Sequence, residues 1–321
     1  MKFKLLILLL ALAIAAFTPA AQAIEAVASF GKLDGSVQVL RESRKIPGRE
    51  GLILNDQDVV VTGKDSKVTI IFRDGSEIRL FQDTRFVIEK AEESAEGQRR
   101  FFYNFKLKVG SFWGRFTKGN QTTSIETPSA TIGIKGTNLA VTQTAEKLDI
   151  ALSEGKIGLR NEDHAYELDA GYRLQGVTKN GTLEDKKTEM PYRITIKADD
   201  PKLVIPEPGD LTELYFTLQL LDVKSRQNLQ RPGKVYISLD NDKFEFPREI
   251  ELNHRGYARV KAIIKPFQTA DYKDGQLTIY AVMDGEQAME VGAGETQLTY
   301  DIPKKIMRTI RVDMSSGRFT E

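Results

Sequence analysis

The sequence predicts an all-β protein with two domains: a turn-rich β-roll or solenoid-like domain followed by an immunoglobulin-like β-sandwich. Apolar and polar residues alternate with period two in many short segments, such as residues 66–72 (SKVTIIF). Turn-forming Gly, Asp and Pro interrupt this pattern about every 8 to 12 residues, and no helical period replaces it. The chain of 321 residues is long enough for two domains of about 150 residues each.

The composition excludes several classes of function. Lys and Arg number 46 against 45 Asp and Glu, which leaves a net charge of +1 and no global attraction to nucleic acid or anionic lipid. Cysteine is absent, which excludes disulfides, thiolate catalysis and zinc–thiolate sites. We therefore expect no cofactor, no metal centre and no nucleic-acid partner.

The first 23 residues have the layout of a secretory signal peptide. Lys2 and Lys4 precede an apolar run over residues 5–17, and Ala21-Gln22-Ala23 is a small-residue cleavage site. The alternative is an uncleaved anchor, but the apolar run is shorter than the roughly 20 residues that span a bilayer. No later stretch resembles a span. We expect cleavage after Ala23 and export to the periplasm or the extracellular space, with no membrane span in the mature chain.

The first domain is expected over residues 24–177. Its predicted strands include residues 36–40, 52–54, 58–62, 66–72, 76–80, 84–88, 101–109, 111–116, 148–152 and 156–159. Asp74-Gly75 between alternating runs is a strong hairpin signal. The charged residues 89–100 are expected to form a loop or a long hairpin tip. Within residues 127–141 (TPSATIGIKGTNLAV), Pro128 fixes a backbone angle and Gly136 separates two short strands.

Several of these turn motifs occur in the order seen in one family. They are Gly35-Ser36-Val37, residues 58–63, residues 72–76, Val109-Gly110, residues 127–130, Gly136-Thr137 and residues 153–157 (SEGKI). In this order, residues 27–176 resemble the FecR domain, the periplasmic part of the iron-citrate signalling regulator and of many standalone exported proteins. One departure is Lys135, where the family often has Arg before the Gly-Thr pair, which keeps the charge but weakens a bidentate role.

The resemblance implies binding or scaffolding in the cell envelope. Signalling members join a cytoplasmic sigma-factor-binding segment to a membrane span, and this chain has a predicted signal peptide in that place. The residues carried over from the family motifs are expected to be mainly structural: Asp74, Gly75, Ser76, Thr127, Pro128, Gly136, Thr137, Glu154 and Gly155.

The composition shifts after Gly176. Residues 178–191 are polar and predict a linker, and residues 192–304 contain about seven or eight short strands, which is typical of an immunoglobulin-like sandwich. Residues 305–321 are expected to be a C-terminal tail.

The candidate binding surface is an aromatic and basic stretch over residues 101–118. If Phe102 and Trp113 were exposed beside Lys106 and Arg115, this face could stack on sugars or bind a partner peptide. The alternative is that these aromatic residues belong to the core. Which of the two holds stays open at this stage.

Other chemistry is weakly supported. His164 and His254 each occur in a polar turn, which favours exposed turn residues over a catalytic or metal role. The neighbouring carboxylates Asp56 and Asp58, Asp199 and Asp200, and Asp240 and Asp242 could serve a glycosidase, but turn bonding explains them more simply. Calcium near Asp240 and Asp242 is an open alternative, although Lys243 and Phe244 break the loop pattern.

These observations predict a non-enzymatic exported protein that binds a partner protein or a cell-envelope polymer. A sheet edge that accepts a partner strand is one expected mechanism. Two alternatives remain: an envelope glycan hydrolase with a carboxylate pair, and an accessory part of a transmembrane signalling system.

Overall fold

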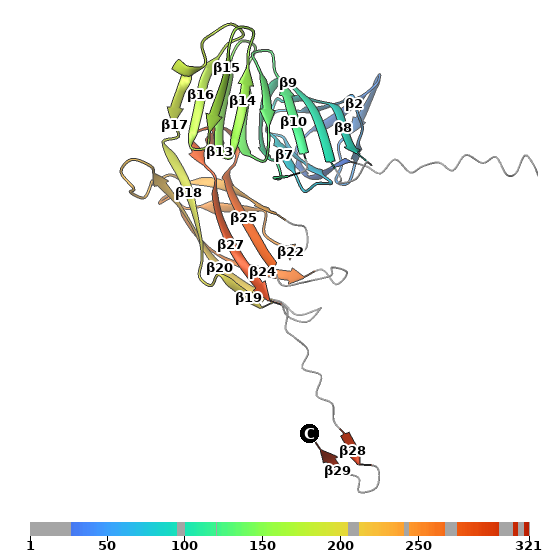
Figure 1. The fold of residues 1–321 in the computed structure, drawn as a ribbon, viewed down its shortest axis with the longest axis vertical. Coiled ribbons are helices and arrows are strands. Elements are labelled where there is room, and N and C mark those ends of the chain that lie inside the picture. The colour runs from blue at the N-terminus through green and yellow to red at the C-terminus, as the bar shows by residue number, and fades with distance from the viewer. Residues whose placement is uncertain are drawn as a thin grey trace, which may run out of the picture.

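The computed structural model describes residues 27–94, 100–119, 121–204, 212–240, 244–266, 275–301, 311–313 and 318–320. The predicted signal peptide lies outside these ranges. The described part folds into two β units that lie against each other (Figure 1). Among the described helices, none is long and apolar enough to cross a membrane.

The first unit contains seventeen strands. They are β1 (Ala28–Asp34), β2 (Val37–Arg41), β3 (Arg44–Pro47), β4 (Ile53–Leu54), β5 (Asp58–Thr62), β6 (Lys67–Phe72), β7 (Glu77–Leu80), β8 (Arg85–Ser94), β9 (Arg100–Arg115), β10 (Gln121–Glu126), β11 (Thr131–Ile134), β12 (Asn138–Gln143), β13 (Leu148–Glu154), β14 (Lys156–Arg160), β15 (Ala165–Asp169), β16 (Tyr172–Val177) and β17 (Lys187–Glu189). The predicted all-β fold class is correct.

These strands form two layers that share the long strand β9. Sheet A has the order β4-β1-β6-β7-β9-β12-β13-β16-β17. Sheet B has the order β3-β2-β5-β8-β9-β10-β11-β14-β15. The chain crosses repeatedly between the layers, usually after one hairpin, which explains the regular spacing of turn residues in the sequence.

Strand β9 passes from sheet B to sheet A at Gly110. Residues before this point pair with β8 and β10, and those after it pair with β7 and β12. Gly110 has a φ of 104°, and a Cβ there would lie 2.4 Å from the Cα of Thr84. Only glycine fits such a close approach with positive φ. The corner therefore depends on the Val109-Gly110 motif.

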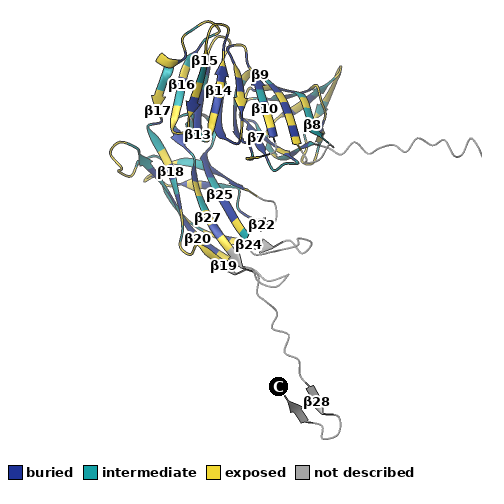
Figure 2. Cartoon of the chain, viewed as in Figure 1, coloured by how far each residue is buried: buried dark blue, intermediate teal, exposed yellow. Residues whose placement is uncertain are grey.

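The core of the first unit lies between the two sheets. Inward positions alternate with exposed ones along the strands, as the colours of Figure 2 show for the strands of the first unit. Phe86, Phe105 and Tyr103 are almost fully buried, with ring centroids 5.2 Å and 5.8 Å apart in succession. Each such side chain contributes about 1.5–3 kcal/mol through burial. Residues 89–100 were expected to form a loop or a long hairpin tip; residues 89–94 extend β8 and pair with the start of β9, as in a long hairpin.

Residues 178–191, predicted as a linker, are closely attached to the first unit. Leu183 is buried in its core, and the 3₁₀ helix η1 (Glu184–Lys186) leads into β17, which pairs with β16. Asn161 donates hydrogen bonds to the carbonyls of Thr178 and Gly181 at 3.0 Å and 2.7 Å. The segment is polar because it lies at the surface, yet its backbone is held in place.

The second unit is a sandwich of two sheets. Sheet C has the order β22 (Phe244–Glu245), β24 (Tyr257–Pro266), β20 (Thr212–Asp222), β18 (Tyr192–Ala198) and β26 (Val291–Gly292). Sheet D has the order β19 (Lys202–Val204), β27 (Gly294–Asp301), β25 (Gly275–Met283), β21 (Gly233–Leu239) and β23 (Glu249–Leu252). The remaining elements are η2 (Gly285–Met289) and the hairpin of β28 (Arg311–Asp313) and β29 (Arg318–Thr320).

One apolar core fills this sandwich. Phe216 and Phe246 stack at 5.4 Å within it, and Leu218, Ile237 and Ile279 are fully buried. The sandwich agrees with the predicted strand series. The closer likeness to immunoglobulin modules stays a prediction.

Candidate functional site

The outer face of sheet A is occupied by the second unit. Phe81, Trp113, Ala140 and Ala151 of the first unit pack with residues of the second, including Tyr236. The Trp113 and Tyr236 rings meet edge to face at 6.0 Å. This face is therefore an internal interface of the protein.

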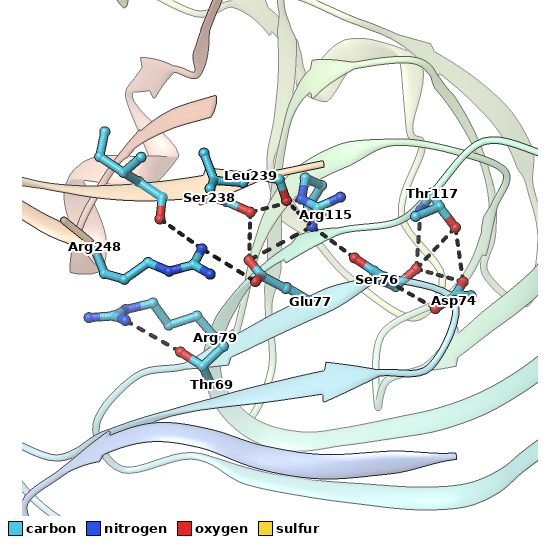
Figure 3. A network of polar contacts seen from close by, with 12 residues as sticks. Thr69, Asp74, Ser76, Glu77, Arg79, Arg115, Thr117, Ser238, Leu239 and Arg248 are labelled. Atoms are coloured by element: carbon cyan, nitrogen blue, oxygen red, sulfur yellow. Dashed lines mark hydrogen bonds and ion pairs between the residues drawn. The ribbon is translucent and has the colours of Figure 1, made fainter. Parts of the chain in front are cut away.

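A buried polar network surrounds these apolar contacts (Figure 3). Arg115 donates to the Ser238 hydroxyl at 2.9 Å and to the Leu239 carbonyl at 2.9 Å, while Ser238 donates to Glu77 at 2.6 Å. Arg248 lies 3.8 Å from Glu77. Because both units supply partners for each buried charge, the network fixes how they dock.

A second ionic cluster centres on Arg79, whose side chain is 3% exposed. It donates to Glu249 at 2.7 Å and to Asp284 at 3.2 Å, and its guanidinium lies 4.2 Å from the centroid of the Tyr236 ring. Lys67 reaches the same two carboxylates at 3.3 Å and 2.9 Å. Partial burial opposes ionisation of Glu249, but the Arg79 hydrogen bond and the charge of Lys67 outweigh it and hold the pKa of Glu249 at about 2.

Two of the predicted binding residues are buried in this interface. Trp113 is 2% exposed and Arg115 is 5% exposed, so neither can offer a surface to an external ligand. Period-two alternation places both on the outer face of sheet A, as expected, but the second unit covers that face. The sequence could not reveal this because the covering strands lie more than a hundred residues away.

The other two residues lie on the outer face of sheet B. Phe102 is 40% exposed on β9. Lys106 lies four residues further along β9 on the same face. It forms ion pairs with Glu89 at 2.7 Å and Glu126 at 2.9 Å, and the hydrogen bonds in these pairs raise the pKa of Lys106. The four candidate residues therefore divide between two opposite faces and do not form one site.

A short groove lies on the outer face of sheet B, over β11, β14 and β15. Gly133 on β11 pairs directly with Gly158 on β14, which in turn pairs with Glu167 on β15. The hollow of about 550 Å³ at this end is lined by Thr131, Gly133, Gly158, Leu159, Arg160, Ala165, Tyr166 and Glu167. The two glycines form its floor.

Backbone geometry does not require either glycine. Neither has a positive φ, unlike Gly136 and Gly155. A Cβ on Gly158 would meet nothing within 4 Å, and one on Gly133 would meet only the Gly158 carbonyl at 3.8 Å. A glycine inside a strand weakens it and often marks close approach of a ligand or of another backbone. The pair therefore creates open space on the sheet without a structural need for it.

The remaining candidate groups have structural partners. Asp58 is fully buried and accepts hydrogen bonds from Arg41 at 2.8 Å and 2.7 Å, while Asp56 accepts one from the Ala91 amide at 2.9 Å. Asp199 pairs with Arg259, and Asp200 accepts a bond from the Lys202 amide. Turn bonding accounts for the Asp200 contact and for the bond that Asp58 accepts from the Asn55 amide at 2.8 Å. Asp56 and Asp199 instead bond partners that are distant in the sequence.

Histidines and metal ligands add nothing to the site. His164 and His254 lie in exposed turns. Across the described residues, no group of three or more metal-type side chains comes together. The calcium alternative depends on Asp242, which lies outside the described residues.

Residues 58–158 match the model of the family described as FecR protein. The chain carries a FecR domain. Among curated proteins, none matches the sequence. The matched residues run from β5 into β14 and so include both sheets, the β9 corner and Gly133 and Gly158 of the groove.

Solved structures with some likeness to the chain are distant. A protein assigned as an anti-sigma factor from Parabacteroides distasonis ATCC 8503 has 13% identity and a TM-score of 0.33, with 41% of this chain and 59% of that chain covered. A glycosyl hydrolase family 2 member from Bacteroides cellulosilyticus has 11% identity and a TM-score of 0.26, with 51% and 23% covered. The chain thus spans less than two thirds of either structure, and neither likeness bears on function.

Two FecR-domain motifs meet at one corner of the fold. A Cβ on Gly155 would lie 2.6 Å from the Gly136 carbonyl, and both glycines have positive φ, of 83° and 66°. Glu154 accepts a bond from Asn138 at 2.7 Å, and Thr137 is buried beside it. These residues hold the turns between sheets A and B.

The hairpin and Thr-Pro motifs also stabilise turns. Asp74 accepts bonds from the Ser76 amide at 3.0 Å and the Thr117 hydroxyl at 2.9 Å, beside Gly75 with a φ of 83°. The Thr127 hydroxyl accepts a hydrogen bond from the Ala130 amide at 3.0 Å and so stabilises the turn that contains the exposed Pro128. These contacts are internal to the fold, and the mainly structural role of the nine motif residues stays a prediction.

Proposed function

We propose that this FecR-domain protein acts without catalysis, by binding an envelope component or a partner protein through the outer face of sheet B. One observation carries the proposal: sheet A is covered by the second unit, whereas sheet B presents a hollow floored by two glycines that the backbone does not require. The matched family supports a binding role. The second unit serves as a rigid support, docked through buried charges on both sides.

We propose the periplasm as the place of action. Three features of the first 23 residues support this location: the charged first residues, the apolar run and the expected cleavage site Ala21-Gln22-Ala23. A periplasmic fraction that contains the chain with Ile24 as its first residue, by N-terminal sequencing, would support this location, and recovery of full-length chain in the cytosol would count against it.

Strand addition is a less favoured mechanism in this geometry. The edge strand β3 carries Arg44, Lys45 and Pro47, features that prevent edge pairing. The edge strand β15 has neither Lys nor Pro and borders the groove. A partner strand could therefore add at β15, and this would place it beside the same face.

Crosslinked capture tests the proposal. The chain from Ile24 onward, with a photo-crosslinker in place of Glu167 at the groove or of Arg259 on sheet C as the matched control, is mixed with periplasmic and outer-membrane extract. We expect saturable products from position 167 alone. Equal products from both positions, or none from position 167, would refute a binding face on sheet B. Cleaved glycan among the products would contradict the absence of catalysis.

A further inference from the structure

The groove on sheet B has a regular cross-strand layout. Strand pairing aligns Asn104, Ser124, Gly133, Gly158 and Glu167 in one row across β9, β10, β11, β14 and β15. All five side-chain positions are exposed or half-buried and so belong to the outer face. The row consists of an amide, a hydroxyl, two glycines and a carboxylate. We call the strip of sheet along this row the trough, and the hollow lies over its Gly133, Gly158 and Glu167.

Larger side chains flank this row. On one side, pairing aligns Lys106, Glu126, Thr131 and Arg160. On the other side stand Phe102, Thr122, Lys156 and Asp169 at the ends of the same strands. Residues two apart on a strand are separated by about 6.7 Å, so the flanking rows lie about 13 Å apart. With about 4.8 Å between strands, five strands give a trough about 19 Å long.

Most charges of the trough are paired. Lys106 is bonded to Glu89 and Glu126 at 2.7 Å and 2.9 Å, and Lys156 is bonded to Glu167 and Asp169 at 3.3 Å each. Among the described residues, Arg160 and the exposed Lys135, which follows β11 on the side of Lys156, have no ion pair. Two unpaired cations on opposite sides are fewer than the continuous row of positive charge that binds a nucleic acid or an anionic polymer.

The backbone at the floor is paired, except along the outer edge of β15. Strands β10, β11 and β14 pair on both edges, so their amides and carbonyls lie in the plane of the sheet and not toward the trough. A peptide laid across the strands would find no backbone partners there. What the trough offers is side-chain amide, hydroxyl, guanidinium and carboxylate groups over a flat floor, with Phe102 at one margin.

These features suit a chain of neutral sugars. Sugar hydroxyls both donate and accept hydrogen bonds, which matches Asn104, Thr131, Arg160 and Glu167. The flat carbon face of a pyranose can lie against a sheet surface without side chains, which Gly133 and Gly158 supply. The same face of a sugar can also pack on an exposed aromatic ring such as Phe102. We infer that the trough binds a neutral glycan that runs across the strands of sheet B, an inference that rests on the proposed binding function.

The glycines provide a sharp test because filling the trough should not harm the fold. In Gly158→Val, the new side chain meets nothing within 4 Å at its Cβ and gains β propensity. The melting temperature should stay equal or rise. Thr217→Val, on the outer face of sheet C, is the matched control because it adds a similar branched side chain far from the trough.

The probes are chitohexaose and cellohexaose as neutral glycans and a sulfated heparin hexasaccharide as the anionic one, by isothermal titration calorimetry with the chain from Ile24 onward. We expect one neutral hexasaccharide to bind at sub-millimolar Kd, at least tenfold loss in Gly158→Val, no change in Thr217→Val and no binding of the sulfated probe. Absence of neutral binding at millimolar concentration overturns the inference, as does binding that Gly158→Val leaves unchanged.

The crosslinking experiment separates this inference from the proposed function. If neutral sugars fail but position 167 captures an envelope protein in a manner that Gly158→Val abolishes, the trough is a protein-binding site and only the glycan assignment is wrong. If both experiments fail, sheet B is not the binding face.

Discussion

The docking of the two units can be tested at Arg79. In Arg79→Ala, Glu249 and Asp284 lose a bonding partner at 2.7 Å and 3.2 Å, and the Tyr236 ring loses its cation. Removing one member of a buried pair costs about 3–5 kcal/mol. The two carboxylates keep Lys67 and are 19% and 16% exposed. We therefore expect a cost at or just below the lower limit, about 2–3 kcal/mol.

Trp113 makes this cost directly measurable. It is the one tryptophan of the chain and is buried against the second unit, so its emission reports whether the units are docked. In urea, the midpoint of the Trp113 transition should fall by about 1–1.5 M if m is about 2 kcal/mol/M. Far-UV circular dichroism should change later, because both sandwiches keep their own cores.

Arg259→Ala is the matched control for Arg79→Ala. Arg259 also pairs with an Asp, but its side chain is 57% exposed and Asp199 is 44% exposed. Such surface pairs contribute about 0–1 kcal/mol. Equal shifts of the Trp113 midpoint in both variants would contradict a docking role of Arg79, as would emission of a solvated indole from Trp113 of the unaltered protein at pH 7.

Three further predictions concern charges and turns. Glu249 has a folded pKa of about 2 against its ordinary 4.5, so its contribution to docking is complete above pH 4.5 and lost as pH falls toward 2; the Trp113 emission should shift to the red over that window, and Glu249→Gln should flatten the dependence. Gly136→Ala must adopt a φ of 66° with its Cβ 2.9 Å from a backbone atom, so we expect a loss of about 2 kcal/mol or more by thermal unfolding, and a clearly smaller loss in Gly171→Ala, where the same atom meets nothing within 4 Å. Asp58→Ala removes a fully buried carboxylate from Arg41, whose side chain is 29% exposed, so we expect a loss of about 2 kcal/mol; a drop in unfolding free energy under about 1 kcal/mol would contradict the structural role of this pair.

Local patterns predicted much of the fold. The Asp74-Gly75 turn, the strand alternation and the break at Gly136 follow from residues close in sequence, and each lies where expected. The linker expected over residues 178–191 differs because its polarity reflects exposure alone, while Leu183 anchors it to the core. Polarity reports contact with water and does not report backbone order.

The candidate site depended on contacts that sequence does not record. Trp113 and Arg115 follow the outward pattern of β9, and only the docked second unit shows that they are buried. The Gly133–Gly158 pair was missed because it arises from the register of β11 against β14. A signal was present: each glycine lies inside a strand, at a position with ordinary φ.

Two kinds of glycine in this chain differ in their physical cause. Gly110, Gly136 and Gly155 have positive φ and approach a neighbour closely, so the fold alone accounts for them. Gly133 and Gly158 have ordinary φ and open space, and each costs the sheet about 0.5–1 kcal/mol relative to Ala. A residue that weakens its own strand without a local compensation points to a demand from outside the fold. For two such residues paired on the exposed outer face of sheet B, the demand we infer is a flat ligand that must lie against the sheet.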